Sequence, residues 1–233
     1  MRTLLLMLAL VLPTMAGREF VSGSSQHAVC SISPISPPFT LHAWFKASRN
    51  DQFSCIIGLG TSTNTSELGL VFINGADTDD MYGLVVQTSA GAATTTKLPR
   101  FATNTWSSIS GVFASSTSRT LYTNGISAAT SSVSHVIDGL DVVQIGGRLS
   151  GTWGGYMSGG ISEGAVWNVA LTASEILSLS QGAAPFMIRP ASIVFYAPLT
   201  GDETSTEWNY FGAAVSLTNS PAPGTSHPRI YRP

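Results

Sequence analysis

Apolar and polar residues alternate along most of this chain, a pattern that predicts β-strands burying one face. The clearest run is FTLHAWFKA at 39–47. Turn-forming residues separate such runs, for example Asn124-Gly125, which suits the positive-φ positions of a type I′ hairpin turn. The other strand-like runs lie at 19–32, 53–60, 66–74, 81–88, 106–113, 119–127, 142–147 and 165–168. Their number and spacing predict an all-β fold, a sandwich of two antiparallel sheets.

One segment departs from this pattern and predicts a short helix over 171–177. Thr172 is placed to cap its N-terminus, and Glu175, three residues further on, would complete a capping box. Gly182 is suited to end so short an element. The sequence therefore predicts a single helical turn in an otherwise all-β chain.

The chain divides into three parts that differ in composition and in their pattern of residues: 1–15, 16–184 and 185–233. Residues 1–15 have the features of a secretory signal, namely a positive charge near the N-terminus, an apolar run, and small residues after that run. Two alternatives to a cleaved signal stay open: residues 1–15 are retained in the protein, or the natural start of the protein is Met15. Residues 16–184 carry most of the strands and the helix. Residues 185–233 form a C-terminal extension with strand-like runs at 192–199 and 211–218 and a proline-rich end, 219–233, expected to lie extended over the surface.

Composition narrows the classes of protein to which the chain can belong. Charged residues make up 10% of its 233 residues and hydrophobic residues 43%, and the net charge is −2. This hydrophobic content argues against disorder. No basic run is present to bind phosphate groups, which argues against nucleic acid as a partner. The apolar run near the N-terminus is too short for a membrane span.

The two cysteines, Cys30 and Cys55, both lie in apolar, strand-like runs. They would form a disulfide if the fold made them cross-strand neighbours. Two buried free thiols is the simpler interpretation. Neither cysteine has the spacing of a metal site.

The order of the motifs resembles that of laminin G-like domains of the concanavalin A-like superfamily. The matching pieces are the strand at 39–47, the strand from Trp106 to Phe113, LYTNG at 121–125, Ile145-Gly146, and ISEGAVWNVALTASEILSLSQ at 161–181. The resemblance covers residues 17–184 and implies a jelly-roll sandwich. The tail, with RPASIVFYAPLTG at 189–201 and the ending HPRIYRP, resembles proteins of this type encoded by tailed bacteriophages.

The residues argue against catalysis. Glycoside hydrolases share this sandwich, and retaining hydrolysis needs two carboxylates about 5 Å apart. In the enzymes of the superfamily they alternate along one strand as Glu-x-Asp-x-x-Glu, a run that this sequence lacks. Glu163 is the one acid of the closing strand region and matches a structural position, while Asp202, Glu203 and Glu207 suit a solvated turn. We therefore expect a non-enzyme without a required cofactor.

The resemblance also implies a candidate calcium site, because laminin G-like domains often hold one Ca²⁺ at the sandwich rim. Asp77, Asp79 and Asp80 form the densest group of acids in the sequence. Ca²⁺ prefers several oxygen ligands together. A solvated loop that binds no metal is the alternative.

Two aromatic residues are candidates for ligand binding. Trp153 and Tyr156 lie in the glycine-rich segment GTWGGY at 151–156, and exposed aromatic faces stack on sugar rings or on apolar patches of other proteins. The alternative is that Trp153 packs over the end of the sandwich. In contrast, Trp44, Trp106 and Trp167 fall in strand-like runs and are expected in the core.

The leading hypothesis is a non-catalytic structural or adhesion protein on a phage virion surface, as a decoration, fibre or spike component. Its partners would be other chains of the assembly, either further copies or capsid and tail proteins. The alternative is a secreted, extracellular lectin-like module that binds glycans through its rim loops. A protein related to glycoside hydrolases is a third, weaker hypothesis.

Overall fold

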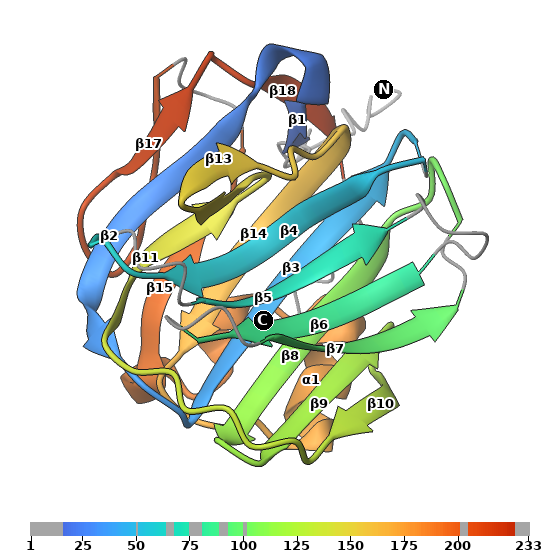
Figure 1. Ribbon diagram of the computed structural model, residues 1–233. Helices are drawn as coiled ribbons and strands as arrows, with labels where there is room; N and C mark the ends of the chain where they lie inside the picture. Colours follow the sequence, from blue (N-terminus) through green and yellow to red (C-terminus); the bar gives the residue numbers. More distant parts are fainter. Residues whose placement is uncertain are drawn as a thin grey trace, which may run out of the picture.

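The fold is a sandwich of two antiparallel β-sheets with one α-helix (Figure 1). The computed structural model describes residues 16–49, 51–63, 68–74, 81–88, 93–99, 102–200 and 205–226. This architecture confirms the fold class predicted from the alternating pattern.

The first sheet has the strand order β10-β9-β8-β3-β14-β1-β18, and β15 also pairs with β14. Its strands are β1 (Ala16–Phe20), β3 (Phe39–Ala47), β8 (Ser107–Ser115), β9 (Ser118–Thr123), β10 (Ile126–Ser131), β14 (Gly159–Trp167), β15 (Ile193–Ala197) and β18 (Ala222–Ser226).

The second sheet has the order β16-β17-β2-β11-β4-β5-β6-β7. Its strands are β2 (His27–Ile35), β4 (Phe53–Gly60), β5 (Leu68–Asn74), β6 (Met81–Gln87), β7 (Ala93–Pro99), β11 (Leu140–Ile145), β16 (Thr206–Glu207) and β17 (Val215–Thr218). A separate small hairpin joins β12 (Arg148–Ser150) to β13 (Thr152–Gly154). Three short 3₁₀ helices span Ser22–Ser24, Pro185–Met187 and Pro190–Ser192.

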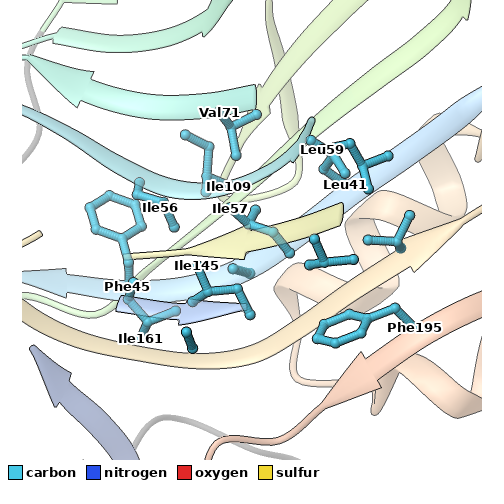
Figure 2. Close-up of a cluster of buried hydrophobic side chains, with 14 of the residues drawn as sticks. Leu41, Phe45, Ile56, Ile57, Leu59, Val71, Ile109, Ile145, Ile161 and Phe195 are labelled. Carbon is cyan, nitrogen blue, oxygen red and sulfur yellow. The ribbon is translucent and has the colours of Figure 1, made fainter. Parts of the chain in front are cut away.

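The core lies between the two sheets. Figure 2 shows Leu41, Phe45 and Ile161 of the first sheet beside Ile57 and Ile145 of the second. All five side chains are at most 1% exposed. On β3 every second residue from Phe39 to Ala47 belongs to this core, which is why the period-two pattern was visible in the sequence. On β4 the adjacent Ile56 and Ile57 both belong to it, at a register shift in the strand.

The helix α1 (Ala173–Ser180) covers part of the outer face of the first sheet. Its capping box is present as predicted: Thr172 accepts from the backbone N–H of Glu175, and Glu175 accepts in return from that of Thr172. The helix is longer than the predicted single turn and packs Ile176 and Leu179 into a cluster that includes Trp167. The helix is short enough that this burial must stabilise it, since isolated helices of this length are marginal.

Three stretches of β-structure were not predicted from the sequence. Strand β7 was not predicted, because its ATTTKLP sequence has no apolar alternation; it is a threonine-rich strand at the sheet edge. The hairpin of β12 and β13 was expected to be a loop. Residues 219–233 were expected to lie over the surface, but Ala222–Ser226 pairs with β1 as an edge strand, where Pro223 is tolerated.

The cysteines are free and buried, in agreement with the simpler of the two interpretations. Complete burial raises the pKa of Cys55 to about 12, so its thiol stays protonated at neutral pH. Among the described residues, no helix is long and apolar enough to cross a membrane.

The C-terminal segment contributes strands to both sheets. β15 pairs with β14 and β18 with β1 in the first sheet, while β17 pairs with β2 in the second. In Figure 1 the orange and red part of the chain accordingly lies beside the blue N-terminal strands. The described part of residues 185–233 is therefore built into the sandwich.

A buried ion pair joins the two ends of the described chain. Arg18 of β1 donates from Nε and Nη2 to Oε1 of Glu207, at 2.9 and 2.5 Å, and from Nη1 to the carbonyl of Pro221 at 2.5 Å. The two side chains are 1% and 0% exposed. The sequence prediction of a solvated turn was therefore wrong for Glu207, because its partner Arg18 is distant in sequence; Asp202 and Glu203 lie outside the described residues.

We expect the variant Arg18→Met to lose about 3–5 kcal/mol of unfolding free energy, because it leaves Glu207 buried without its partner charge. Urea unfolding followed by circular dichroism measures this loss. The double variant Arg18→Met/Glu207→Leu should recover part of it, since both charges are then gone. Arg49→Ala, which breaks an exposed ion pair with Asp51, is the matched control and should unfold like the wild type. Equal midpoints for Arg18→Met and Arg49→Ala would contradict this account.

A chain that ends at residue 184 should fail to fold cooperatively, because it lacks Glu207 and the strands that cover β14, β1 and β2. Light scattering should find it aggregated and its thermal transition should be absent. A chain ending at residue 226 keeps every described contact and is the control. A monomeric, cooperatively unfolding product of the shorter chain would instead establish 16–184 as an independent domain.

Candidate functional site

The hairpin of β12 and β13, followed by Gly155 and Tyr156, stands at one rim of the sandwich beside β4 (Figure 1). Hydrogen bonds fix the segment that follows it. Gly155 accepts from the backbone N–H of Cys55 at 2.8 Å, and the carbonyl of Tyr156 accepts from Nε2 of Gln52 at 2.9 Å. Gly155 has a φ of 59°, a conformation that a glycine adopts without strain. The position of Tyr156 is therefore determined by its backbone.

The imidazole of His27 connects the two aromatic residues predicted from the sequence. Its ring stacks on Trp153, with 3.8 Å between the ring centroids, and lies 5.8 Å from that of Tyr156. One face of Trp153 is thus covered, although the side chain is only half-buried. Burial lowers the pKa of His27, against the opposing effect of the hydrogen bond to the carbonyl of Ser25. The ring is therefore neutral at pH 7.

Tyr156 borders a hollow of about 330 Å³ that the sequence did not reveal. Phe53 supplies a second aromatic side chain, and Gln52, Arg49 and Ser22 supply hydrogen-bonding groups. These residues are far from Tyr156 in the sequence, and the start of β4 and the first 3₁₀ helix bring them to it. A concave site that combines aromatic surface with a few polar groups is the usual form of a small-ligand site.

Charges around this hollow are partly balanced. Arg49 forms a two-point ion pair with Asp51, at 2.5 and 2.6 Å. The guanidinium of Arg148 lies over the ring of Phe53, 5.0 Å from its centroid. The rim therefore offers planar cationic and aromatic surfaces together, which suit a ligand with both hydroxyl groups and apolar faces.

The two buried carboxylates of the described chain both have structural partners. Glu163, in the irregular part of β14, accepts a hydrogen bond from the hydroxyl of Tyr196 at 2.7 Å. Glu207 is bound by Arg18. His42 contacts the hydroxyl of Ser110 at 2.8 Å, but both side chains are 1% exposed and are closed to a substrate.

The predicted calcium ligands Asp77, Asp79 and Asp80 lie outside the described residues. Within the described part of the chain, no group of three or more His, Cys, Asp or Glu side chains could hold a metal ion. The calcium site thus stays a prediction from the sequence. Of the three tryptophans expected in the core, Trp44 and Trp167 are buried, and Trp106 is half-buried with the ammonium of Lys46 5.7 Å from its ring centroid.

Several solved structures share this fold. A candidate carbohydrate-binding protein from Bacteroides ovatus is 20% identical, with a TM-score of 0.63 over 93% of this chain and 63% of that chain. A heptameric SAP-like pentraxin from Limulus polyphemus is 18% identical, with a TM-score of 0.60 over 91% and 94%. The CBM40 module of a Ruminococcus gnavus IT-sialidase, bound to α2,3-sialyllactose, is 16% identical, with a TM-score of 0.50 over 71% and 93%.

At these identities the likeness shows the fold, and this chain spans less than two thirds of the length of the Bacteroides protein. No match is found among curated protein sequences. A family model described as the concanavalin A-like lectin/glucanases superfamily matches residues 22–177. Since this match covers well over half of the chain and agrees with the observed sandwich, the chain belongs to the concanavalin A-like lectin/glucanases superfamily.

Proposed function

We propose that this chain is a non-catalytic carbohydrate-binding module that acts outside the cell and holds its ligand in the rim hollow beside Tyr156. The observation that carries the proposal is the hollow itself, where Tyr156 and Phe53 lie beside the amide of Gln52 and the guanidinium of Arg49. Aromatic rings stack on the apolar faces of sugars, while amide and guanidinium groups hydrogen-bond to their hydroxyl groups.

Trp153 is linked to this site through His27. His27 lies between its ring and Tyr156, so the three rings form one packed unit at the rim. Because a rigid aromatic group loses little conformational freedom on binding, such packing favours affinity. Trp153 does not border the hollow, and a direct contact of Trp153 with the ligand stays a prediction from the sequence.

The absence of catalysis is part of the proposal. Hydrolysis would need a carboxylate pair facing a substrate, whereas Glu163 and Glu207 are buried and bonded to Tyr196 and Arg18. The neighbouring structures support the same interpretation, since one is a candidate carbohydrate-binding protein and another is a module bound to a sialylated sugar.

The virion-surface role stays a prediction from the sequence, resting on the resemblance of the tail to phage-encoded proteins. The described part of that tail is engaged within its own sandwich. Glycan binding and a place on a virion are compatible, because an adhesion component needs a receptor site. Partners within an assembly are likewise a prediction.

We expect Tyr156→Ala to weaken glycan binding about tenfold, because it removes the aromatic surface of the hollow but keeps the backbone contacts of residue 156. A glycan array followed by titration calorimetry on the best ligand measures this loss. Phe186→Ala removes an exposed ring from a different part of the surface and is the control. If no glycan binds, or if both variants bind as the wild type does, the rim hollow is not a carbohydrate site.

We expect mildly acidic pH to destabilise the folded protein, because His27 at the rim then becomes protonated. Its pKa in the folded protein is lowered from 6.5, so the unfolded chain binds more protons at mildly acidic pH. Above pH 6.5 the neutral His27 ring makes its full contribution to the free energy of unfolding. This contribution is lost as the pH falls towards the lowered pKa of His27 in the folded protein. Between pH 7 and pH 5 the melting temperature of the wild type should therefore fall more than that of His27→Gln. Parallel pH profiles for the two proteins would contradict this assignment.

A further inference from the structure

Trp208 is the most exposed large aromatic side chain of the described residues, at 70%, and Tyr210 follows at 60%. Both lie in the segment after β16, beyond the residues 22–177 that match the family. Large apolar side chains on a surface are common singly, but an exposed tryptophan beside a concave surface is typical of a binding site.

The backbone on both sides of Trp208 is anchored by buried side chains. Glu207 is bound to Arg18. Asn209 accepts from the backbone N–H groups of Tyr196 and Phe211, at 3.2 and 3.1 Å, and donates to the carbonyl of Ala213 at 3.0 Å. The indole of Trp208 is thus held in solvent on a fixed backbone, which lowers the entropy lost when it binds a ligand.

Two hollows meet beside this tryptophan. The first, of about 360 Å³, is bordered by Trp208, Thr206 and Asn209. The second, of about 570 Å³, is bordered by Phe211, Ser31 and Ser33. Gly212 borders both hollows, so they are neighbours on the surface, and together we call them the tail groove. Each of the two volumes lies within the roughly 300–1,000 Å³ range of small-ligand pockets, and two adjacent hollows suit a ligand of more than one sugar unit.

Charge and chemistry indicate what the tail groove holds. Among its described lining residues Glu207 alone is charged, and Arg18 neutralises it. The remaining polar groups are hydroxyls and an amide, from Thr206, Ser31, Ser33 and Asn209. We propose that the tail groove is a second carbohydrate site, which binds a neutral oligosaccharide by stacking one sugar ring on Trp208 and hydrogen-bonding further hydroxyl groups along the groove.

This site is separate from the rim hollow. No residue that borders the rim hollow also borders the tail groove. The proposal does not rest on binding at Tyr156, and each site can exist without the other. A contact between two copies of the chain would also bury Trp208, and the test below distinguishes this alternative.

The test is affinity electrophoresis of the full chain in native gels that contain neutral xylan, β-glucan, mannan or galactan, with anionic polygalacturonate for comparison. We expect at least one neutral polymer to retard the wild type and Trp208→Ala to bind it about tenfold more weakly, whereas Trp208→Phe keeps most of the binding. Tyr156→Ala tests the rim hollow in parallel, and Ile126→Ala, at an equally exposed apolar residue, is the matched control. The melting temperature of Trp208→Ala should match that of the wild type, because the indole is in solvent.

The outcomes separate the two sites. Loss of retardation in Trp208→Ala but not in Tyr156→Ala supports the tail groove, whatever happens at the rim. Loss in Tyr156→Ala alone supports the rim hollow and overturns the tail groove. Retention by polygalacturonate only, or by no polymer, also overturns it. A dimer in light scattering that dissociates in Trp208→Ala would show that the surface joins two copies of the chain.

Discussion

A charge that is removed from water must be paired, and in this fold that requirement couples the two ends of the described chain. Arg18 lies in β1 and is buried, so it depends on Glu207 and on the carbonyl of Pro221. Those partners come from the C-terminal segment, which can supply them only if β17 and β18 pair with β2 and β1. The ion pair therefore links β1 to the C-terminal segment.

The same constraint positions the proposed second site at Trp208. Because Glu207 is fixed by Arg18, and Asn209 by the backbone around it, Trp208 between them stands in solvent at a defined place. At the rim, the backbone contacts of Gly155 and Tyr156 serve the same purpose for the rim hollow. In both places hydrogen bonds fix the backbone beside an aromatic side chain, which is exposed at Trp208 and half-buried at Tyr156; a rigid binding site requires such support.

Much of the fold was predictable because it is encoded locally. The strands at 39–47 and 53–60 were predicted to the residue, since alternation and turn residues define their ends. The capping box of Thr172 and Glu175 is likewise a short-range signal. The order of motifs then identified the superfamily.

The rest depends on contacts between distant residues. Glu207 seemed to be a solvated acid because Arg18, its partner, lies at the other end of the described chain. The ATTTKLP strand has no alternation, since it is a threonine-rich strand at a sheet edge. The burial of Trp167 was predicted from its strand-like run, whereas the exposure of Trp208 was not predicted. For the rim, the sequence indicated Tyr156 but not Phe53 or Gln52, which only the folded chain brings to it.

The most direct test of carbohydrate binding is a two-dimensional ¹H–¹⁵N NMR spectrum of the five tryptophan indole N–H groups during titration with glycans. We expect the signal of Trp153, Trp208 or both to shift when a glycan binds. The signal of Trp167, whose indole donates to the carbonyl of Ile188 in the interior, should stay in place. A spectrum that no glycan changes, or one in which only the buried indoles move, would contradict the assignment of this sandwich as a carbohydrate-binding module.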